Sequence, residues 1–209
     1  MHRDVLGDDD PAQHPGHAVL HGVRAAAAIV RGKTRQLDIG CFGERLFVYV
    51  ASFGAFTRTS YAASQDMKNV LGHFGYLLEG IRDLDTLRPY SVRITADGEK
   101  LDGDYLFGAV ANSTSIAGMM KLEGEQVVLD DGRFELLLIP NPKNVLELQN
   151  LIWALLNQQY DAGGLIFRHV TSLHVETDQE LPWSLDGEYE PSRPAVDITN
   201  CQRALTMLL

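Results

Sequence analysis

The sequence predicts a mainly β fold of the α+β class, an antiparallel sandwich-like sheet with a few flanking helices. Three observations lead to this prediction. Short runs of residues alternate between apolar and polar, as strands with one buried face do. Tight turns containing glycine separate most of these runs. Few helical segments come between them, whereas a doubly wound parallel sheet needs a helix after most strands.

The predicted elements can be assigned in order along the chain. Helical spacing covers residues 19–30, where alanines are frequent, and residues 74–87. A third helix begins near Pro142, where Asn141 is placed to cap it. The predicted strands, each bounded by turn residues, are 36–42, 45–52, 90–95, 101–110, 126–129, 134–139, 166–170, 173–177, 183–185 and 196–198.

Composition and charge exclude several classes of protein. The 209 residues are 45% hydrophobic and 22% charged, which is typical of a globular protein with an ample core. The net charge of -10 argues against nucleic acid as a partner and against a polybasic membrane anchor. No apolar run reaches the roughly 18 residues that a transmembrane helix needs. Residues 1–18 have no apolar period and are predicted to be a disordered tail.

The sequence contains two cysteines, Cys41 and Cys201. They do not indicate a disulfide framework or a thiolate metal site. We therefore predict a protein of the reducing cytoplasm.

Asp186 and Glu188 stand on either side of Gly187, where a strand-like run turns. In a strand the two carboxylates would share one face, and around a turn they can converge on one pocket. A carboxylate placed there can accept a proton from a hydroxyl or hold a nucleotide group. The alternative is a surface turn, because Asp-Gly is a strong hairpin signal.

Two other Asp-Gly sequences have the same ambiguity. In Asp130-Asp131-Gly132, one aspartate and nearby backbone carbonyls can hold a hard cation such as Mg²⁺. The alternative for this segment is a type I′ turn. We interpret Asp97-Gly98 as a structural turn only.

Polar residues after predicted strands are further candidates for binding a substrate or nucleotide. Lys68 precedes a helix and can contact a phosphate, or it is simply a solvated lysine. Asn112, Ser113 and Thr114 can supply hydroxyls and amides to a ligand, or they form a loop with side-chain-to-backbone hydrogen bonds.

The order of the motifs closely resembles the bacterial diacylglycerol kinase and lipid kinase family, which is related to sphingosine kinases and, in fold, to NAD kinases. The resemblance extends from about Val19 to the C-terminus. The motifs that carry it are Leu37-Asp38-Ile39-Gly40, Tyr49-Val50-Ala51-Ser52-Phe53-Gly54, Lys68-Asn69-x-Leu71-Gly72, Tyr76-Leu77-Leu78-Glu79-Gly80, Asn112-Ser113-Thr114-Ser115, Leu129-Asp130-Asp131-Gly132-x-Phe134-Glu135 and Leu185-Asp186-Gly187-Glu188.

The resemblance implies an ATP-dependent lipid kinase whose C-terminal domain is a β-rich sandwich. It implies a diacylglycerol-like membrane lipid as the substrate, and hence a cytoplasmic protein peripheral to the membrane. It implies that Asp186 is the general base that takes a proton from the lipid hydroxyl, and that Glu188 positions the nucleotide or its metal. It also implies a structural Mg²⁺, held by the side chain of Asp131 and the carbonyls of Val128 and Arg133.

Members of this family carry an α/β domain with a Gly-Gly-Asp-Gly-Thr phosphate loop ahead of the matched region, and the sequence here has no such loop. We therefore expect residues 19–209 to form the C-terminal domain alone, with residues 19–32 as a remnant linker helix. ATP binding by this chain should then be weak, and a homodimer would cover the surface left by the other domain. The alternatives are a non-catalytic lipid- or partner-binding module and a kinase of a soluble substrate.

Overall fold

The computed structural model describes residues 30, 32–54, 88–116, 120–121, 127–160 and 162–208. The predicted tail, the helix predicted over 74–87 and most of the helix predicted over 19–30 lie outside these ranges. The chain divides into two compact units, one of residues 1–36 with 206–209 and the other of residues 37–205. The second unit contains all of the site residues discussed below.

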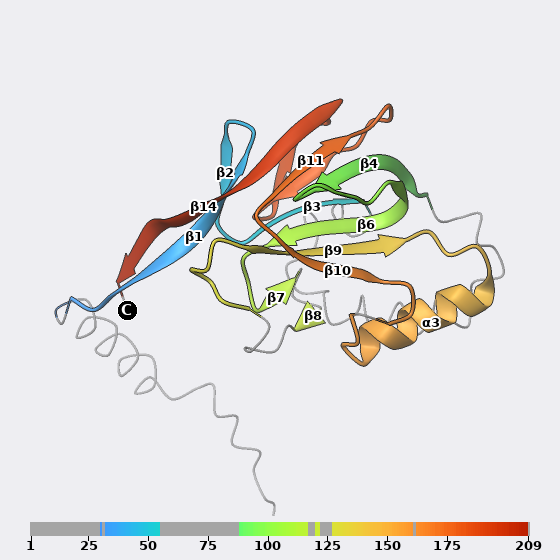
Figure 1. Cartoon of the computed structure of the whole chain (residues 1–209), viewed down its shortest axis with the longest axis horizontal. Helices are drawn as coiled ribbons and strands as arrows, with labels where there is room; N and C mark the ends of the chain where they lie inside the picture. The colour runs from blue at the N-terminus through green and yellow to red at the C-terminus, as the bar shows by residue number, and fades with distance from the viewer. Residues whose placement is uncertain are drawn as a thin grey trace, which may run out of the picture. The chain divides into compact units, whose positions relative to one another are not determined.

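Most of the described chain is β-strand, and the strands pair antiparallel, which confirms the predicted fold class. One α-helix lies between β9 and β10 (Figure 1). The elements are β1 (Thr34–Phe42), β2 (Arg45–Phe47), β3 (Val50–Gly54), β4 (Tyr90–Ala96), β5 (Glu99–Lys100), β6 (Gly103–Ala111), β7 (Ser115–Ile116), β8 (Met120–Lys121), β9 (Phe134–Pro140), α3 (Val145–Leu156), β10 (Ile166–Val170), β11 (Ser172–Glu176), β12 (Trp183–Leu185), β13 (Glu188–Glu190) and β14 (Ala195–Leu208).

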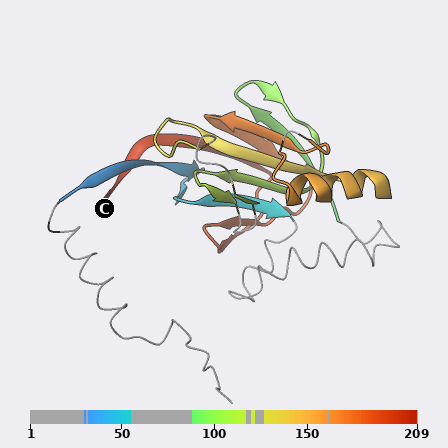
Figure 2. The same ribbon diagram turned by 90° about the horizontal axis from the view of Figure 1, so that it is seen from below.

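The main sheet runs in the order β13-β12-β3-β6-β4-β11-β14-β1-β2. It branches at β6, which pairs with β3, β4 and β9, and β9 in turn pairs with β10. Because β6 belongs to both branches, the sheet curls around a shared interior instead of lying flat. Figure 2 shows the strands stacked in layers, with α3 at the edge of the stack.

The larger core lies between the layers and is built on aromatic contacts. The ring of Trp183 meets those of Phe42 and Phe53 edge to face, with centroids 5.0 Å apart in both pairs. Gly40 is opposite Phe47 in the β1–β2 register, and a Cβ at Gly40 would lie 2.0 Å from the Phe47 ring. The glycine of the Leu37-Asp38-Ile39-Gly40 motif is therefore required for packing.

A second core lies between the β6–β9 strand pair and α3. Leu151 and Ala154 of the helix pack with Phe107 and Leu137 of the strands. The helix cap differs from the prediction: Asn144 is the N-cap and not Asn141. The Asn144 side chain accepts from the backbone N–H of Glu147 at 2.9 Å, and the Glu147 carboxylate accepts from the N–H of Lys143. This pair of bonds resembles a capping box, except that Glu147 accepts from the residue before the cap, and it explains the later start.

Several predicted strands differ from the observed ones. The strand predicted at 45–52 is interrupted at Val48 and Tyr49, because their backbone N–H groups turn to the Asp186 side chain. The described part of 126–129, predicted as a strand, is a loop. The strand predicted at 196–198 extends much further, as β14.

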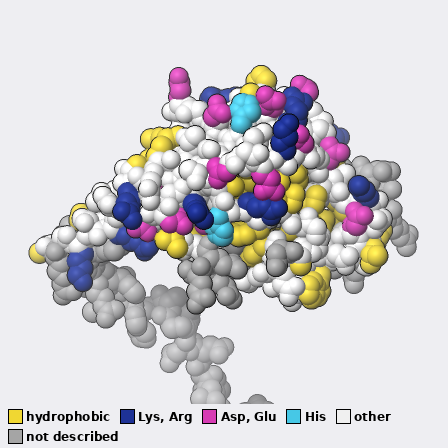
Figure 3. All heavy atoms as spheres, viewed as in Figure 1, with side chains coloured by type: hydrophobic (Ala, Val, Ile, Leu, Met, Phe, Trp, Pro, Cys, Tyr) yellow, Lys and Arg dark blue, Asp and Glu magenta, His cyan; other side chains and the backbone are white. Residues whose placement is uncertain are grey.

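The outer face of β4, β11 and β14 carries a charged network (Figure 3). Opposite charges face each other in register, with Arg93 opposite Glu176 and His174 opposite Asp197. Hydrogen bonds that the His174 ring donates to Asp197 and, with less effect, to Glu176 raise the pKa of His174. These side chains are well exposed, so water and salt screen each pair and it is expected to add little to stability.

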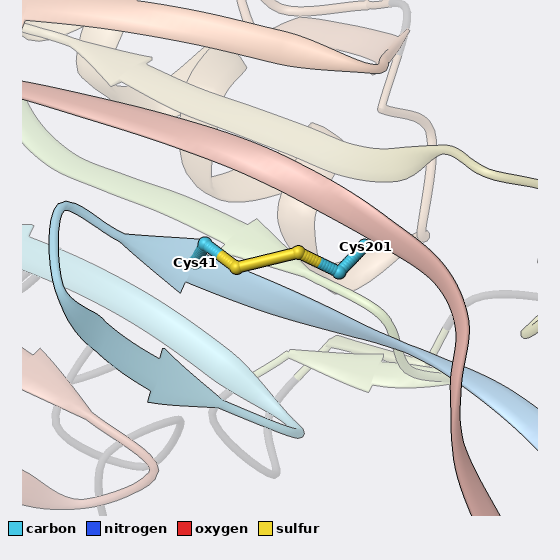
Figure 4. Close-up of a disulfide and its surroundings, with 2 residues drawn as sticks. All are labelled: Cys41 and Cys201. Atoms are coloured by element: carbon cyan, nitrogen blue, oxygen red, sulfur yellow. A yellow bond between two sulfur atoms is a disulfide. The ribbon is translucent and has the colours of Figure 1, made fainter.

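The structure pairs the two cysteines, which corrects the expectation of no disulfide. Cys41 in β1 and Cys201 in β14 are joined across neighbouring strands, with Cα atoms 6.8 Å apart (Figure 4). The two positions are 160 residues apart in the sequence, so no local pattern indicates that they meet. The bond closes the first described strand onto the last.

Reduction of this disulfide should lower the stability of the domain. A bond that closes so long a loop restricts the unfolded chain, and its loss is expected to cost about 2–5 kcal/mol. The measurement is urea unfolding with and without a thiol reductant. The unfolding midpoint of Cys201→Ser should equal that of the reduced wild type and should not depend on the reductant. Equal unfolding midpoints for the oxidised and reduced wild type would contradict the prediction.

Candidate active site

Asp186 occupies the turn between β12 and β13, with a backbone φ of 50°, and Gly187 follows with a φ of 92°. Positive φ at both positions is the signature of a type I′ turn, which Asp-Gly favours. The exposed Asp186 side chain reaches across to the β2–β3 turn. There Oδ2 accepts from the N–H of Val48 at 2.7 Å, and Oδ1 accepts from those of Tyr49 and Val50 at 2.8 and 2.9 Å.

These hydrogen bonds have two effects: they hold the β12–β13 turn to the β2–β3 turn, and they fix the orientation of the Asp186 carboxylate. Its own backbone N–H donates to the carbonyl of Val50 at 2.8 Å, so the two turns are locked together. A carboxylate offers about four acceptor positions, and three are used here, two of them on Oδ1. The remaining acceptor position is on Oδ2.

The turn that holds Asp186 also contacts the predicted ligand-binding loop. The carbonyl of Tyr49 accepts from the backbone N–H of Asn112 at 3.1 Å. The Asn112 side chain donates in turn to the carbonyls of Asp38 and Leu129 at 2.8 and 3.2 Å. Segments from four distant parts of the sequence therefore form one connected group.

Asp38 is the buried centre of this group and has no exposed surface. Its backbone N–H donates to the carbonyl of Leu129 at 2.8 Å. Its carboxylate accepts from the N–H of Gly132 at 2.6 Å and from the N–H of Arg203 at 2.7 Å. The loop predicted to hold Mg²⁺ is thus fixed to β1 and β14.

The loop itself is not the type I′ turn that was the alternative interpretation. Only Gly132 of the Asp131-Gly132 pair has a positive φ, at 83°. The exposed Asp131 side chain accepts from the N–H of Arg133 at 3.0 Å, which folds the loop back on itself. On the β14 side, Gln202 and Arg203 both donate to the carbonyl of Asp130.

The donor set of this loop suits a hard cation. A carboxylate and backbone carbonyls are the oxygen ligands that Mg²⁺ prefers, and the Asp131 side chain is exposed at the surface. Val128, two residues before Asp130, is also exposed. In the described ranges, no three histidine, cysteine or acidic side chains are grouped as a metal site would need, so any cation here depends on backbone oxygens.

Glu135 lies just beyond the loop, at the second position of β9, and is 1% exposed. Among the described residues, its Oε2 has no hydrogen-bond partner. Burial raises the pKa of this carboxyl to about 8, the negative charge of Asp131 acts in the same direction, and backbone N–H donors of Glu135 and Ser113 oppose it. Glu135 therefore holds a proton near neutral pH.

The structure brings together most, but not all, of the predicted site residues. Glu188 begins β13 beside Asp186 and is exposed. Ser113 is buried next to Asn112, and Thr114 is exposed at the end of the same loop. Lys68 lies outside the described residues.

Sequence reasoning did not select Asp38, Glu135 or Glu190, although all three are acidic and buried. Glu190 pairs with Arg193 at 2.6 Å and with Arg45 at 3.7 Å, which ties β13 to β2. The available signal was an acidic residue inside a run of strand-forming apolar residues. Burying such a residue is unfavourable unless the fold gives its carboxyl group hydrogen-bond or ionic partners.

Comparison with known proteins identifies the family. The family model described as the YegS C-terminal NAD kinase β-sandwich-like domain matches residues 50–208. The chain belongs to this family. Its curled antiparallel sheet is the β-sandwich of that description.

Relatives of this YegS-type domain are named diacylglycerol kinases. The protein from Staphylococcus carnosus is 29% identical over 174 residues, covering 83% of this chain and 56% of the relative. The protein from Bacillus subtilis is 26% identical over 187 residues, covering 90% of this chain and 61% of the relative. A solved diacylglycerol kinase from Bacillus anthracis shares the fold, with a TM-score of 0.60 at 22% identity over 88% of this chain and 59% of that chain.

The chain therefore spans little more than half the length of these relatives. No helix in the described part of the chain is long and apolar enough to cross a membrane.

Replacing Glu135 by glutamine should change how stability depends on pH. The unfolded carboxyl titrates near 4.5 and the folded one near 8, so only the folded state keeps the proton between these values. Wild-type stability should consequently fall as pH rises from 4.5 to 8, whereas glutamine has no proton to lose. The stability gained by Glu135→Gln should grow by up to about 1.4 kcal/mol per pH unit across this window.

Urea unfolding at pH 5 and pH 8 measures this difference. Glu44→Gln, at an exposed turn residue, is the matched control and should leave the pH dependence unchanged. Parallel pH profiles for the wild type and Glu135→Gln would show that Glu135 does not hold the proton.

Proposed function

We propose that this chain supplies the C-terminal domain of an ATP-dependent lipid kinase. The orientation of Asp186 is the observation that carries the proposal. Three backbone N–H groups fix its carboxylate and leave an acceptor position on Oδ2 at the surface. That arrangement suits a group that must accept a proton from a hydroxyl.

In the proposed reaction, the lipid hydroxyl gives its proton to Asp186 Oδ2. The hydroxyl oxygen forms a bond to the γ-phosphorus of ATP, and the bond from that phosphorus to the bridging oxygen of ADP breaks. ADP leaves with the electron pair, and the proton later passes from Asp186 to solvent. Positioning and charge neutralisation dominate phosphoryl transfer, so a weakly basic carboxylate is sufficient.

We assign the other predicted residues supporting parts. Glu188, beside the base, orients the nucleotide or its metal. Asp131 and the carbonyls of Val128 and Arg133 hold a structural Mg²⁺, which when bound neutralises negative charge in the loop. The Asn112 amide already donates to two carbonyls of the protein, so the exposed Thr114 is the better candidate in its loop for contacting nucleotide.

Exposed apolar side chains beside Asp186 support a lipid as the acceptor. Leu46, Val48 and Tyr189 are 61%, 44% and 55% exposed. Val48 donates directly to Asp186, and the ion pair between Arg45 and Glu190 holds β2 against β13. A long apolar substrate can lie on these side chains while its hydroxyl reaches the carboxylate.

A binding module without catalysis is the second candidate function. The same three hydrogen bonds favour it, because they give Asp186 a purely structural task. Under this alternative, the turn would hold its shape for a lipid or protein partner and no phosphate would move.

Phosphate transfer distinguishes the two functions. Labelled Mg-ATP is mixed with diacylglycerol in micelles and with a fusion of this chain to the part of the Bacillus subtilis relative that lies outside the match. We expect transfer by the fusion, weak or no transfer by the chain alone, and a loss of roughly 10²–10⁴-fold in Asp186→Asn.

Asp97→Asn is the matched control for this experiment. Asp97 also begins a type I′ Asp-Gly turn and accepts two backbone N–H groups, but it lies at the β4–β5 turn. Its replacement should affect stability and leave transfer intact. Undiminished transfer by Asp186→Asn would remove Asp186 as the base, and a folded fusion with no activity would favour the binding module.

A further inference from the structure

The buried Asp38 carboxylate contacts the proposed cation loop. It has no exposed surface through which it could bind a ligand itself. It is fully buried, and one oxygen accepts from the N–H of Gly132 within the loop. The other oxygen accepts from the N–H of Arg203 in β14. Its backbone groups add a bond to Leu129, at the start of the loop, and one from Asn112. Asp38 is thus bonded to both ends of the loop.

Two backbone conformations support the view that Asp38 fixes this geometry. Gly132 has a φ of 83° and Arg203 a φ of 53°, and both residues direct their N–H groups to Asp38. A left-handed arginine inside a strand costs free energy and persists only where its surroundings require it. Arg203 then reaches the loop again, since its Nε donates to the carbonyl of Asp130.

The charge of Asp38 has no cationic partner within the described residues, since none of their ion pairs includes it. Two neutral N–H donors are a modest compensation for a fully buried carboxylate. Asp130 and Asp131 bring further negative charge to the same loop. A divalent cation among the loop oxygens would offset two of these three negative charges.

We propose that Asp38 is a positioning residue for the loop of residues 128–133, holding its backbone in the shape that binds a divalent cation. Asp38 does not bind the ion itself. It fixes Leu129 and Gly132. Of the candidate ligands, Val128 precedes Leu129, Asp131 precedes Gly132, and Arg133 follows Gly132. This inference rests on the proposed cation site, and its test separates the two.

Mn²⁺ binding to the whole chain, followed by electron paramagnetic resonance and by the Mn²⁺-induced rise in melting temperature, tests the proposal without any assay of activity. Asp38→Asn keeps the size of the side chain but replaces one acceptor oxygen by a donor. The affinity for Mn²⁺ should fall roughly 10–100-fold, as is typical when a group supporting metal ligands is removed. Asp131→Asn, which changes a candidate ligand, should also weaken binding.

Asp97→Asn again provides the matched control. The Asp97 carboxylate accepts from the N–H groups of Thr171 and Ser172, just as the Asp38 carboxylate accepts from two backbone N–H groups. A general loss of stability would therefore appear in both variants. Only Asp38→Asn should lose Mn²⁺ affinity. If Asp38→Asn does not fold, Gly132→Ala tests the same contact from the loop side, because its positive φ disfavours any side chain.

The possible outcomes are distinct. Lost affinity in Asp38→Asn and Asp131→Asn, with Asp97→Asn unchanged, supports the proposal. If Asp131→Asn loses Mn²⁺ affinity and Asp38→Asn keeps it, the positioning role is wrong and the cation site still holds. The same conclusion applies to Gly132→Ala where that variant is used in place of Asp38→Asn. A wild-type chain that binds no Mn²⁺ overturns both.

Discussion

The hydrogen bonds of the buried Asp38 carboxylate hold together segments that lie far apart in the sequence. They join β1, the loop before β9 and the middle of β14. A buried carboxylate without these donors would be strongly unfavourable, so the contacts are required as a set. The Cys41–Cys201 disulfide links β1 and β14 close to the same point. Both features join β14 to β1 within the 37–205 unit.

From this centre, a short series of contacts leads to the candidate base. Asn112 joins Asp38 to Tyr49, and Tyr49 donates to Asp186. The proposed cation loop and the proposed base are therefore parts of one bonded group in the 37–205 unit. The path between the two aspartates consists of the Tyr49 backbone and of Asn112, whose side-chain amide donates to the backbone carbonyl of Asp38.

The general fold was predictable because its signals are local. Alternating residues and glycine turns indicated β4, β9, β10 and β12, and Asp-Gly turns were found at Asp97 and Asp186. The interruption between β2 and β3 was not predictable in the same way. It depends on a side chain more than a hundred residues away, which competes with the strand for the N–H groups of Val48 and Tyr49.

The candidate site was predicted in part, for a related reason. Asp186, Asn112 and Asp131 stand in motifs of polar residues after strands. Hydrogen bonds connect Asp186 and Asn112 with Asp38, to which Gly132, the neighbour of Asp131, also donates. Asp38 and Glu135 also stand in motifs that carry the family resemblance, but an acidic residue within a strand pattern is expected at the surface unless its burial is known. The disulfide was missed because two cysteines 160 residues apart carry no local signal.

The most direct test of this account is a crystal structure of the chain soaked in Mn²⁺, examined by anomalous scattering. The account predicts a peak within bonding distance of the Asp131 carboxylate and of a backbone carbonyl in the loop, with Asp38 still bonded to Gly132. An ordered loop with no anomalous peak at the same Mn²⁺ concentration would contradict it.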